Sequence, residues 1–379
     1  MSEGRLTVSL GAGDLPAHGM YATELVNTET PFSLTIPVSP AEPASATVPE
    51  GVYLVRTLLP GGEQLTATAE VTAGSEAAVT VEAAGPPTPG TKGGDGPSVA
   101  VWLRAWGTAD PEPWPPGVAA APEPTGRVVL QVPVAPGWRA LQLGGRTVAW
   151  RVVRLPPAEA CRVVLDRVAD DDDADAGVRM RVWGTDPRAE SVLRYLAAGQ
   201  AGHARAMAGD LDVAAGGEVP ATAEAACAAG YLLLRSRGTA GVRWAARAAD
   251  RFDTVPDVHV VQGALLLRER GLSRQRLGRR ALLEAYRLGL PHYTEGLRLL
   301  FDGLRWLASA DGRDRAVESA VAELRDHAAA CDWTAPQTSF WGRDPRTPSL
   351  RRIDGDLPYG NTLFWVRVGR EKRFIAVRR

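Results

Sequence analysis

The chain has 379 residues, of which 45% are hydrophobic, and its formal net charge is −1. This length and apolar content predict two or three folded domains. The near-neutral charge excludes a whole-chain attraction to nucleic acid or to an anionic membrane. No apolar run approaches the length of a membrane span, and no basic segment with a long apolar stretch opens the sequence. We therefore expect a cytoplasmic protein without membrane insertion. Arginine outnumbers lysine by 41 to 2, which favours a bacterial genome rich in G and C.

The N-terminal region, up to position 85, consists of short alternating segments separated by glycine-rich turns such as LPGGEQ and TAGSEA. Strands at this spacing predict a small β-sandwich. Residues 49–83, PEGVYLVRTLLPGGEQLTATAEVTAGSEAAVTVEA, resemble the carboxypeptidase-regulatory-like or transthyretin-like sandwich, in which a GxYxV strand precedes a hairpin. This resemblance implies an accessory module. The expected strands are Leu6–Leu10, Phe32–Ile36, Gly51–Leu59, Gln64–Val71 and Ala77–Glu82.

The segment AGPPTPGTKGGDGP, residues 84–97, is rich in proline and glycine, which excludes a helix or an inner strand and predicts a linker. A second β-domain is expected after it, interrupted by a proline-rich loop over 109–126. Its expected strands are Ser98–Trp106, Arg127–Val134, Thr147–Leu155, Cys161–Val168 and Gly177–Trp183.

Helical patterns begin at Asp186–Pro187, because the Asp186 carboxylate can accept hydrogen bonds from a first helical turn and Pro187 tolerates the first position. A terminal β-hairpin is expected from 362–368 and 373–378, packed against the last helix or a β-domain, because a lone hairpin is marginally stable. The predicted helices cover 187–208, 221–236, 240–251, 257–270, 273–288, 293–308 and 313–331.

Three glycines, Gly230, Gly263 and Gly296, recur at one constant spacing, and the first two head the similar stretches GYLLLRSRG and GALLLRERG. Pairs of helices that repeat with this period, about 33 residues, build α-solenoids, which stack into extended binding surfaces. The layout over 221–331 resembles tetratricopeptide-like repeats in length and in the turn glycine, although the family's Trp-x-x-Leu-Gly-x-x-Tyr pattern is absent. The resemblance implies the architecture and not the family's peptide-binding positions.

The expected fold class is therefore α+β multidomain, with N-terminal β-sandwich domains, an αα-repeat domain and a C-terminal hairpin. The expected domains are a small sandwich over 1–85, a linker over 86–97, a second β-domain over 98–184, a helical-repeat domain over 185–335 and a basic hairpin segment over 336–379.

The first helices of the repeats are expected to line a groove that binds a protein partner. His259 and His292 lie one repeat period apart and could form a polar ladder, although histidines near a helix start are commonly packing residues kept by duplication. The predicted partner-binding residues are Arg235, His259, Gln262, Arg268, His292, Glu295 and Arg298.

Two other classes of function stay open. His327 and Cys331 are spaced i, i+4, the minimum geometry of an activated thiol, and would support a hydrolase-type enzyme, as would a cleft between domains. Residues 340–379 hold ten basic and four acidic side chains with interleaved aromatics, a composition suited to nucleic acid or to an acidic protein surface. The expected basic patch is Arg351, Arg352, Arg367, Arg370 and Arg373.

Several other patterns point to structural roles. The three cysteines, Cys161, Cys227 and Cys331, are widely separated and lack a CxxC pair, so we expect core residues and no disulfide framework. The acidic run Asp170–Asp173 fails the EF-hand pattern and indicates a solvated loop. A phrase with Trp, Gly and Asp-Pro recurs near Trp106, Trp183 and Trp341 and is typical of a strand exit.

No phosphate-binding loop, dinucleotide fingerprint, nucleophile elbow or zinc-protease motif is present, so we expect no enzyme activity, no cofactor and no metal. The sequence predicts a protein-interaction scaffold or adaptor. By analogy of architecture, its partner would be a component of a bacterial signalling or defence assembly, such as a caspase-like peptidase.

Overall fold

The structure is a computed structural model. It describes residues 2–11, 15, 19–60, 63–82, 99–105, 119–122, 128–134, 139–144, 149–167, 178–211, 217–235, 241–269, 271–310, 314–353, 362–368 and 371–377. The chain divides into two units, one formed by residues 1–90 with 186–213 and the other by residues 91–185 with 214–379.

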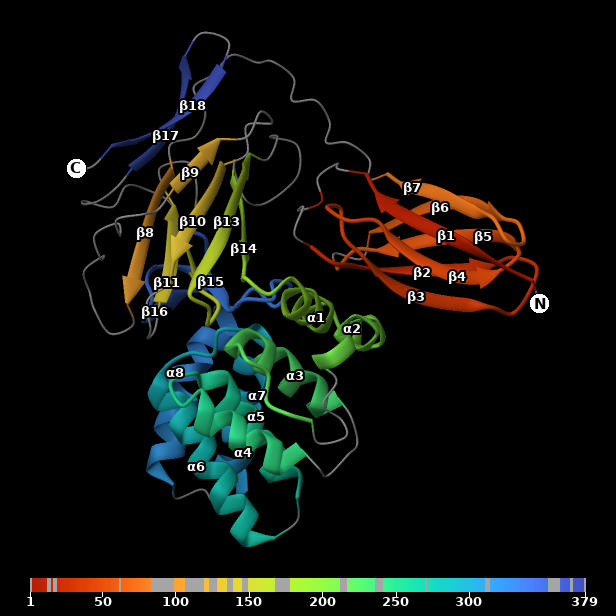
Figure 1. The fold of residues 1–379 in the computed structure, drawn as a ribbon. Coiled ribbons are helices and arrows are strands. Elements are labelled where there is room, and N and C mark those ends of the chain that lie inside the picture. The colour runs from red at the N-terminus through yellow and green to blue at the C-terminus, as the bar shows by residue number, and fades with distance from the viewer. Residues whose placement is uncertain are drawn as a thin grey trace. The chain divides into compact units, whose positions relative to one another are not determined.

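The first unit contains two sheets packed around one core (Figure 1, red to orange). Strand β1 shows why: Leu6, Val8 and Leu10 are buried while the residues between them are not, the alternation of a half-buried strand. One sheet has the order β4-β1-β7 and the other β3-β2-β5-β6. The strands are β1 Glu3–Leu10, β2 Tyr21–Asn27, β3 Ser33–Val38, β4 Ala44–Pro49, β5 Gly51–Leu58, β6 Gln64–Val71 and β7 Glu76–Val81.

Two helices that follow much later in the sequence belong to this first unit. The carboxylate of Asp186 accepts from the backbone N–H groups of Arg188 and Ala189 at 3.0 Å, which confirms the predicted start of helix α1 (Pro187–Ala197). The Tyr195 hydroxyl donates to the carbonyl of Leu58 and accepts from the amide of Ala22, and so ties α1 to the sandwich. Helix α2 (Ala201–Ala208) and a 3-10 turn (Gly209–Leu211) come next.

The second unit has three layers, because its larger sheet is buried on both faces. Leu141 and Val153 pack against the smaller sheet, whereas their neighbours Ala140 and Val152 pack against the helices. The smaller sheet has the order β14-β13-β10-β9 and the larger β16-β15-β12-β11-β8-β17-β18. The strands are β8 Val99–Ala105, β9 Ala119–Pro122, β10 Val128–Pro133, β11 Arg139–Gly144, β12 Arg151–Arg154, β13 Ala160–Arg167, β14 Val178–Trp183, β15 Ser339–Asp344, β16 Thr347–Ser349, β17 Thr362–Val368 and β18 Glu371–Val377.

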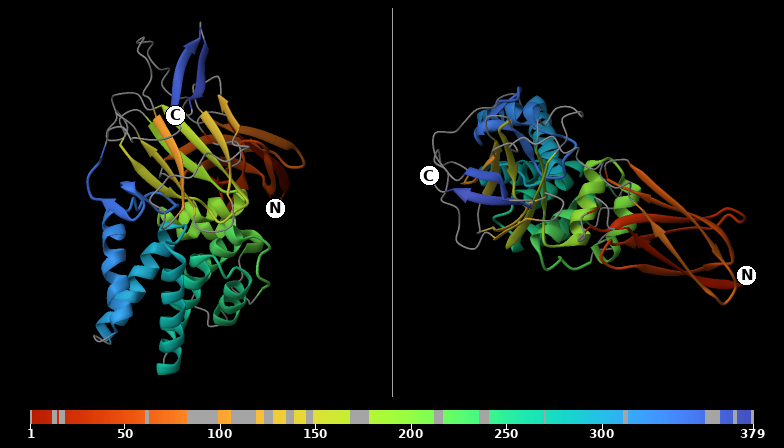
Figure 2. Two further views of the ribbon diagram at one scale, coloured as in Figure 1. Left: turned by 90° about the vertical axis from the view of Figure 1, so that its left-hand side faces the viewer. Right: turned by 90° about the horizontal axis from the view of Figure 1, so that it is seen from above.

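Six helices form the third layer of this unit, and Figure 2 shows the long ones side by side in its left-hand view (teal to blue). They are α3 Ala223–Arg235, α4 Gly241–Arg251, α5 Pro256–Arg268, α6 Leu272–Leu288, α7 Thr294–Ala310 and α8 Arg315–Ala330. The terminal hairpin β17–β18 extends the larger sheet through pairing of β17 with β8. The α+β class is therefore confirmed: β-sheets first, then helices, then a short hairpin.

Several details differ from the sequence predictions. The helix expected over 187–208 is two helices, separated at Gly199, whose φ of +75° is left-handed. Strand β9 lies within the predicted proline-rich loop. Strands β2, β4, β11, β15 and β16 were not predicted, because polar, charged or small residues interrupt their apolar positions and leave a weak local pattern. The linker at 86–97, Trp106 and Asp170–Asp173 lie outside the described residues.

Candidate functional site

Helices α3, α5, α6 and α7 approach one another closely, and glycines stand at their contacts. A Cβ atom on Gly230 would lie 2.9 Å from a methyl group of Val261, and one on Gly263 would meet Leu282 at 2.6 Å. Helix α5 begins one repeat period after α3, but the interval from the start of α5 to the start of α7 is longer. The constant glycine spacing therefore places Gly296 in the first turn of α7, where a Cβ would overlap the Tyr231 hydroxyl.

A buried carboxylate fixes the start of α7. Asp257, which is fully buried, accepts a hydrogen bond from the Tyr231 hydroxyl at 2.6 Å. The backbone N–H groups of His292 and Tyr293 donate to it at 2.7 and 3.2 Å. These two amides immediately precede α7, so Asp257 of one helix binds the positive end of another. We call these four residues, together with Arg154, the Asp257 network.

Arg154 and His292 connect this network to the larger sheet. Nε of Arg154, a buried β12 residue, donates to the carbonyl of Leu290 at 3.0 Å, and Nδ1 of His292 donates to the carbonyl of Leu155 at 2.5 Å. Burial lowers the pKa of His292, and the nearby Arg154 lowers it further, so the imidazole is neutral. Burial raises the pKa of Asp257, while the hydrogen bond from Tyr231, the two amides and Arg154 oppose that shift.

The network positions a second group of charges at the surface, which we call the arginine cluster: Arg235, Arg268, Arg298 and Glu295. Arg235 follows Tyr231 by one helical turn, and Glu295 is the second residue of α7. Oε1 of Glu295 accepts from Nη2 of Arg235 at 2.9 Å and from Nη2 of Arg298 at 2.8 Å. Nη1 of Arg268 donates to the carbonyl of Leu234 at 2.5 Å, at the end of α3.

Charge within the arginine cluster is only partly compensated. The Glu295 side chain is 10% exposed, whereas those of Arg235 and Arg298 are 39% and 43% exposed. Partial burial and then the charges of Arg235 and Arg298 lower the pKa of Arg268, and Glu295 opposes this. Arg235, Arg268 and Arg298 therefore repel one another around Glu295 at a solvent-facing position. Arg298 also pairs with Asp302 at 3.7 Å, so three cations share two carboxylates, and an additional anion would be stabilised there.

The structure brings together four of the seven predicted partner-binding residues and separates the other three. His259 is half-buried within α5, and its Nε2 contacts the carbonyl of Asp253 at 2.9 Å. His292 is buried in the loop before α7, so the two histidines form no ladder. Gln262 is half-buried on α5. The longer α6, with 17 residues against 11 in α4, shifts His292 out of the repeat register.

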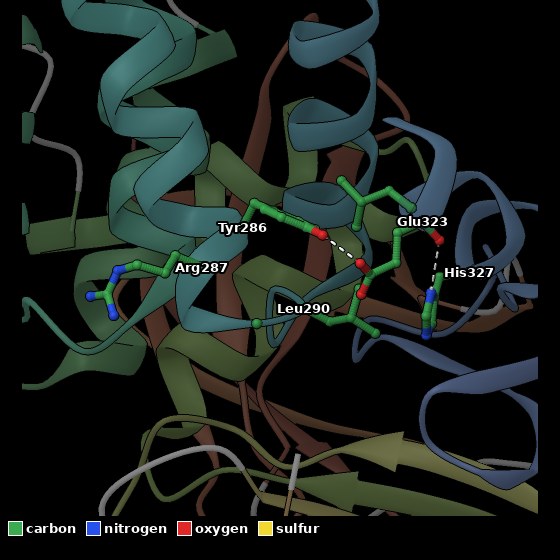
Figure 3. Close-up of a pocket in the computed structure, with 7 residues that line it drawn as sticks. Tyr286, Arg287, Leu290, Glu323 and His327 are labelled. Atoms are coloured by element: carbon green, nitrogen blue, oxygen red, sulfur yellow. Dashed lines mark hydrogen bonds between the residues drawn. The ribbon is translucent and has the colours of Figure 1, made fainter. Parts of the chain in front are cut away.

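A shallow pocket of about 200 Å³ lies beside His327 (Figure 3). Its close-up shows the Tyr286 hydroxyl donating to the carboxylate of Glu323, with Arg287 pointing away from both. Both ring nitrogens of His327 contact backbone carbonyls, those of Glu323 at 3.3 Å and Pro345 at 3.1 Å. The imidazole therefore ties α8 to the β15–β16 turn.

Cys331 lacks the features of an activated thiol. It is buried at the end of α8, and burial raises its pKa to about 12, which is the opposite of the shift that a nucleophilic thiolate needs. Cys161 and Cys227 are buried as well, and none of the three cysteines is in a disulfide. Within the described ranges, no three His, Cys, Asp or Glu side chains converge as metal ligands.

The predicted basic patch is described in part. Arg351 is exposed, and the guanidinium of Arg352 lies over the ring of Trp341 at 5.2 Å, with Arg151 at 4.4 Å from the same ring. The backbones of Arg367 and Arg373 lie in β17 and β18, and Arg370 falls outside the described residues. In the part of the chain described, no helix combines the length and apolarity of a membrane span.

Sequence reasoning missed the Asp257 network. The only local signal was an acidic residue in the first turn of a helix after Pro256, a common capping feature. Its partners come from 26 residues before and 35 to 36 residues after Asp257 and from strand β12, so no short motif contains them.

A comparison with known protein families adds to this description. Residues 191–378 are similar to the Y4kD C-terminal domain family. The matched region contains helices α3 to α8 and the terminal hairpin, and includes the arginine cluster and the Asp257 network apart from Arg154. No curated protein matches the chain.

Proposed function

We propose that the chain is a non-catalytic, cytoplasmic scaffold or adaptor that binds another protein through the surface of α3, α5 and α7. The observation that carries this proposal is the arginine cluster, in which guanidinium groups from three helices gather near Glu295: Arg235 and Arg298 pair with its carboxylate, and Arg268 is near enough for their charges to lower its pKa. Cations held together at a cost of mutual repulsion, on a rigid support, are suited to recognition of an acidic partner. The use of alternate helices, α3, α5 and α7, supports a tetratricopeptide-like mode of binding.

The finer expectations belong to the same proposal. The first sandwich would be a transthyretin-like accessory module, and the partner would be a component of a bacterial signalling or defence assembly, such as a caspase-like peptidase. The supporting argument is the order of β-structure and helices in one chain, which is analogy of architecture.

The test is affinity capture from a lysate of the organism that carries the gene, with nuclease present throughout. The bait is the full chain, compared with Arg235→Gln/Arg268→Gln/Arg298→Gln and with a matched variant, Arg325→Gln, on α8. Recovery of one stoichiometric protein by wild type and Arg325→Gln, and its loss with the triple variant, is the expected result. Equal recovery by all three baits would contradict the proposal.

The enzyme alternative makes a separate prediction about thiol chemistry. Because all three cysteines are buried and the pKa of Cys331 is raised to about 12, none should react with a disulfide reagent at pH 8 until the chain unfolds. Titration of thiols with and without denaturant measures this. One thiol that reacts within seconds in the folded protein would restore Cys331 as a candidate nucleophile.

A further inference from the structure

The exposed face of α7 continues the arginine cluster along the helix. Glu295, Arg298, Asp302 and Trp306 are spaced i, i+3, i+7 and i+11, which places them on one stripe of an α-helix. The ring of Trp306 is among the exposed large apolar side chains, with the residue 44% exposed. Arg298 also pairs with Asp302 at 3.7 Å, and the Asp302 side chain is 53% exposed.

The stripe combines a cationic end with an aromatic end. Arginine and tryptophan are among the residues most enriched at the positions that dominate protein interfaces. Three turns of helix separate Glu295 from Trp306, a rise of about 16 Å. An extended peptide covers that length in about five residues.

Because acidic side chains stand among the arginines on this surface, it is better suited to a ligand with one or two carboxylates than to a continuous polyanion. A nucleic-acid backbone would bring phosphates against Glu295 and Asp302, whose carboxylates lie among the arginines. A peptide can place one or two carboxylates against Arg235 and Arg268 and leave the acidic positions uncontacted.

We infer that the arginine cluster and Trp306 together bind an acidic peptide segment of a partner protein, in which carboxylates precede or follow an apolar side chain at a distance of about five residues. This inference rests on the proposed scaffold function and specifies the chemistry of its partner. Glu295 then acts as a resident counter-ion that competes with the carboxylate of the peptide.

The experiment uses fluorescently labelled peptides of about a dozen residues and the full-length chain, with binding followed by anisotropy. The probe carries two adjacent glutamates and two leucines, separated by a spacer of five Gly or Ser. One control peptide has glutamine in place of glutamate, and a second has a spacer of a single Gly. An oligothymidine of matching length is the competing polyanion.

The acidic probe should bind and both control peptides should bind at least about tenfold more weakly, because each lost contact group costs about that factor. Arg268→Gln, Arg298→Gln and Trp306→Ala should each weaken binding by about tenfold. Glu295→Gln should strengthen it, a gain that damage to the fold would not produce. Arg325→Gln on α8 should leave the affinity unchanged, and added salt should weaken it.

Three results would overturn the inference: no binding of the acidic probe, equal binding of the glutamine peptide, or tighter binding of oligothymidine at the same arginines. If the lysate capture nevertheless recovers a partner that depends on the arginine cluster, the scaffold function stands and only the acidic-peptide chemistry falls. If neither the peptide experiment nor the lysate capture gives its expected result, the scaffold function is contradicted as well.

Discussion

The Asp257 network and the arginine cluster both join α3 and α5 to the start of α7, but their charges are compensated differently. Asp257 is buried, and its oxygens receive two backbone amides and a hydroxyl. The arginine cluster is solvent-facing, and its three cations share the carboxylate of Glu295 and, through Arg298, that of Asp302. A buried charge without a partner costs much free energy, whereas an excess of exposed positive charge costs little and can still bind a partner. The first therefore stabilises the fold and the second is suited to binding.

Removal of the buried carboxylate of Asp257 should have the largest effect on stability and is the strongest test of the difference between the two regions. Asp257→Ala removes a negative charge near the buried guanidinium of Arg154 and leaves three donors without their acceptor, and should cost about 3 to 5 kcal/mol of unfolding free energy. Urea unfolding followed by far-UV circular dichroism measures it. Asp302→Ala, at an exposed position of α7, is the control and should change stability by less than about 0.5 kcal/mol. Similar values for the two variants would show that Asp257 is not the organising charge.

Gly296→Ala tests how closely the helices pack around the Asp257 network. The added Cβ would overlap the Tyr231 hydroxyl and approach Oδ1 of Asp257 to 2.8 Å, so the helices must separate at a cost of about 1 to 3 kcal/mol. Gly202→Ala in α2 is the matched control, because nothing lies within 4 Å of the Cβ that it would add. This variant should raise the free energy of unfolding by about 0.5 to 1 kcal/mol. Thermal unfolding of both variants gives the comparison; equal effects would contradict the predicted crowding.

Asp314 is intermediate between the two regions, because its side chain is 17% exposed and pairs with Arg279 while it caps α8. Asp314→Ala should cost about 1 kcal/mol at pH 7. The hydrogen bond from Arg279 lowers the pKa of Asp314 below 3.8, so this stabilisation is present above that pH and is lost as the pH falls through the lowered pKa. Urea unfolding of wild type and variant at neutral pH and at strongly acidic pH checks it. A difference that persists unchanged in acid would refute the electrostatic origin.

Glu295→Gln tests the charges of the exposed arginine cluster. It should have the smallest effect on the free energy of unfolding among these variants. Loss of the shared carboxylate leaves Arg235, Arg268 and Arg298 mutually repelling, which should destabilise by about 0.5 kcal/mol at low salt. Because the groups face solvent, salt at about 1 M should remove the difference. Thermal midpoints across a salt series measure this. A penalty that does not depend on salt would indicate a packing role for Glu295.

Local chemistry was sufficient for most helices and for the terminal hairpin. The Asp186 cap, the approximate bounds of most helices and the terminal hairpin follow from capping residues, helical periods and turn residues, all of which act within a few positions of the chain. Helix breaks and strands of mixed polarity were harder to predict from the sequence. Gly199 and strand β4 give weak local signals, and packing against other elements decides their structure.

The sequence by itself determined the α+β class, the helical region and the placement of Arg235 and Arg268 at equivalent helix ends, because the repeated LLLR stretch is local. Only the tertiary structure decided which polar residues meet. A lengthened α6 moved His292 from the expected ladder into the buried network, and Asp257 found donors from other segments of the chain. Burial and long-range hydrogen bonding select such partners through the packing of whole elements, and no spacing along the chain encodes them.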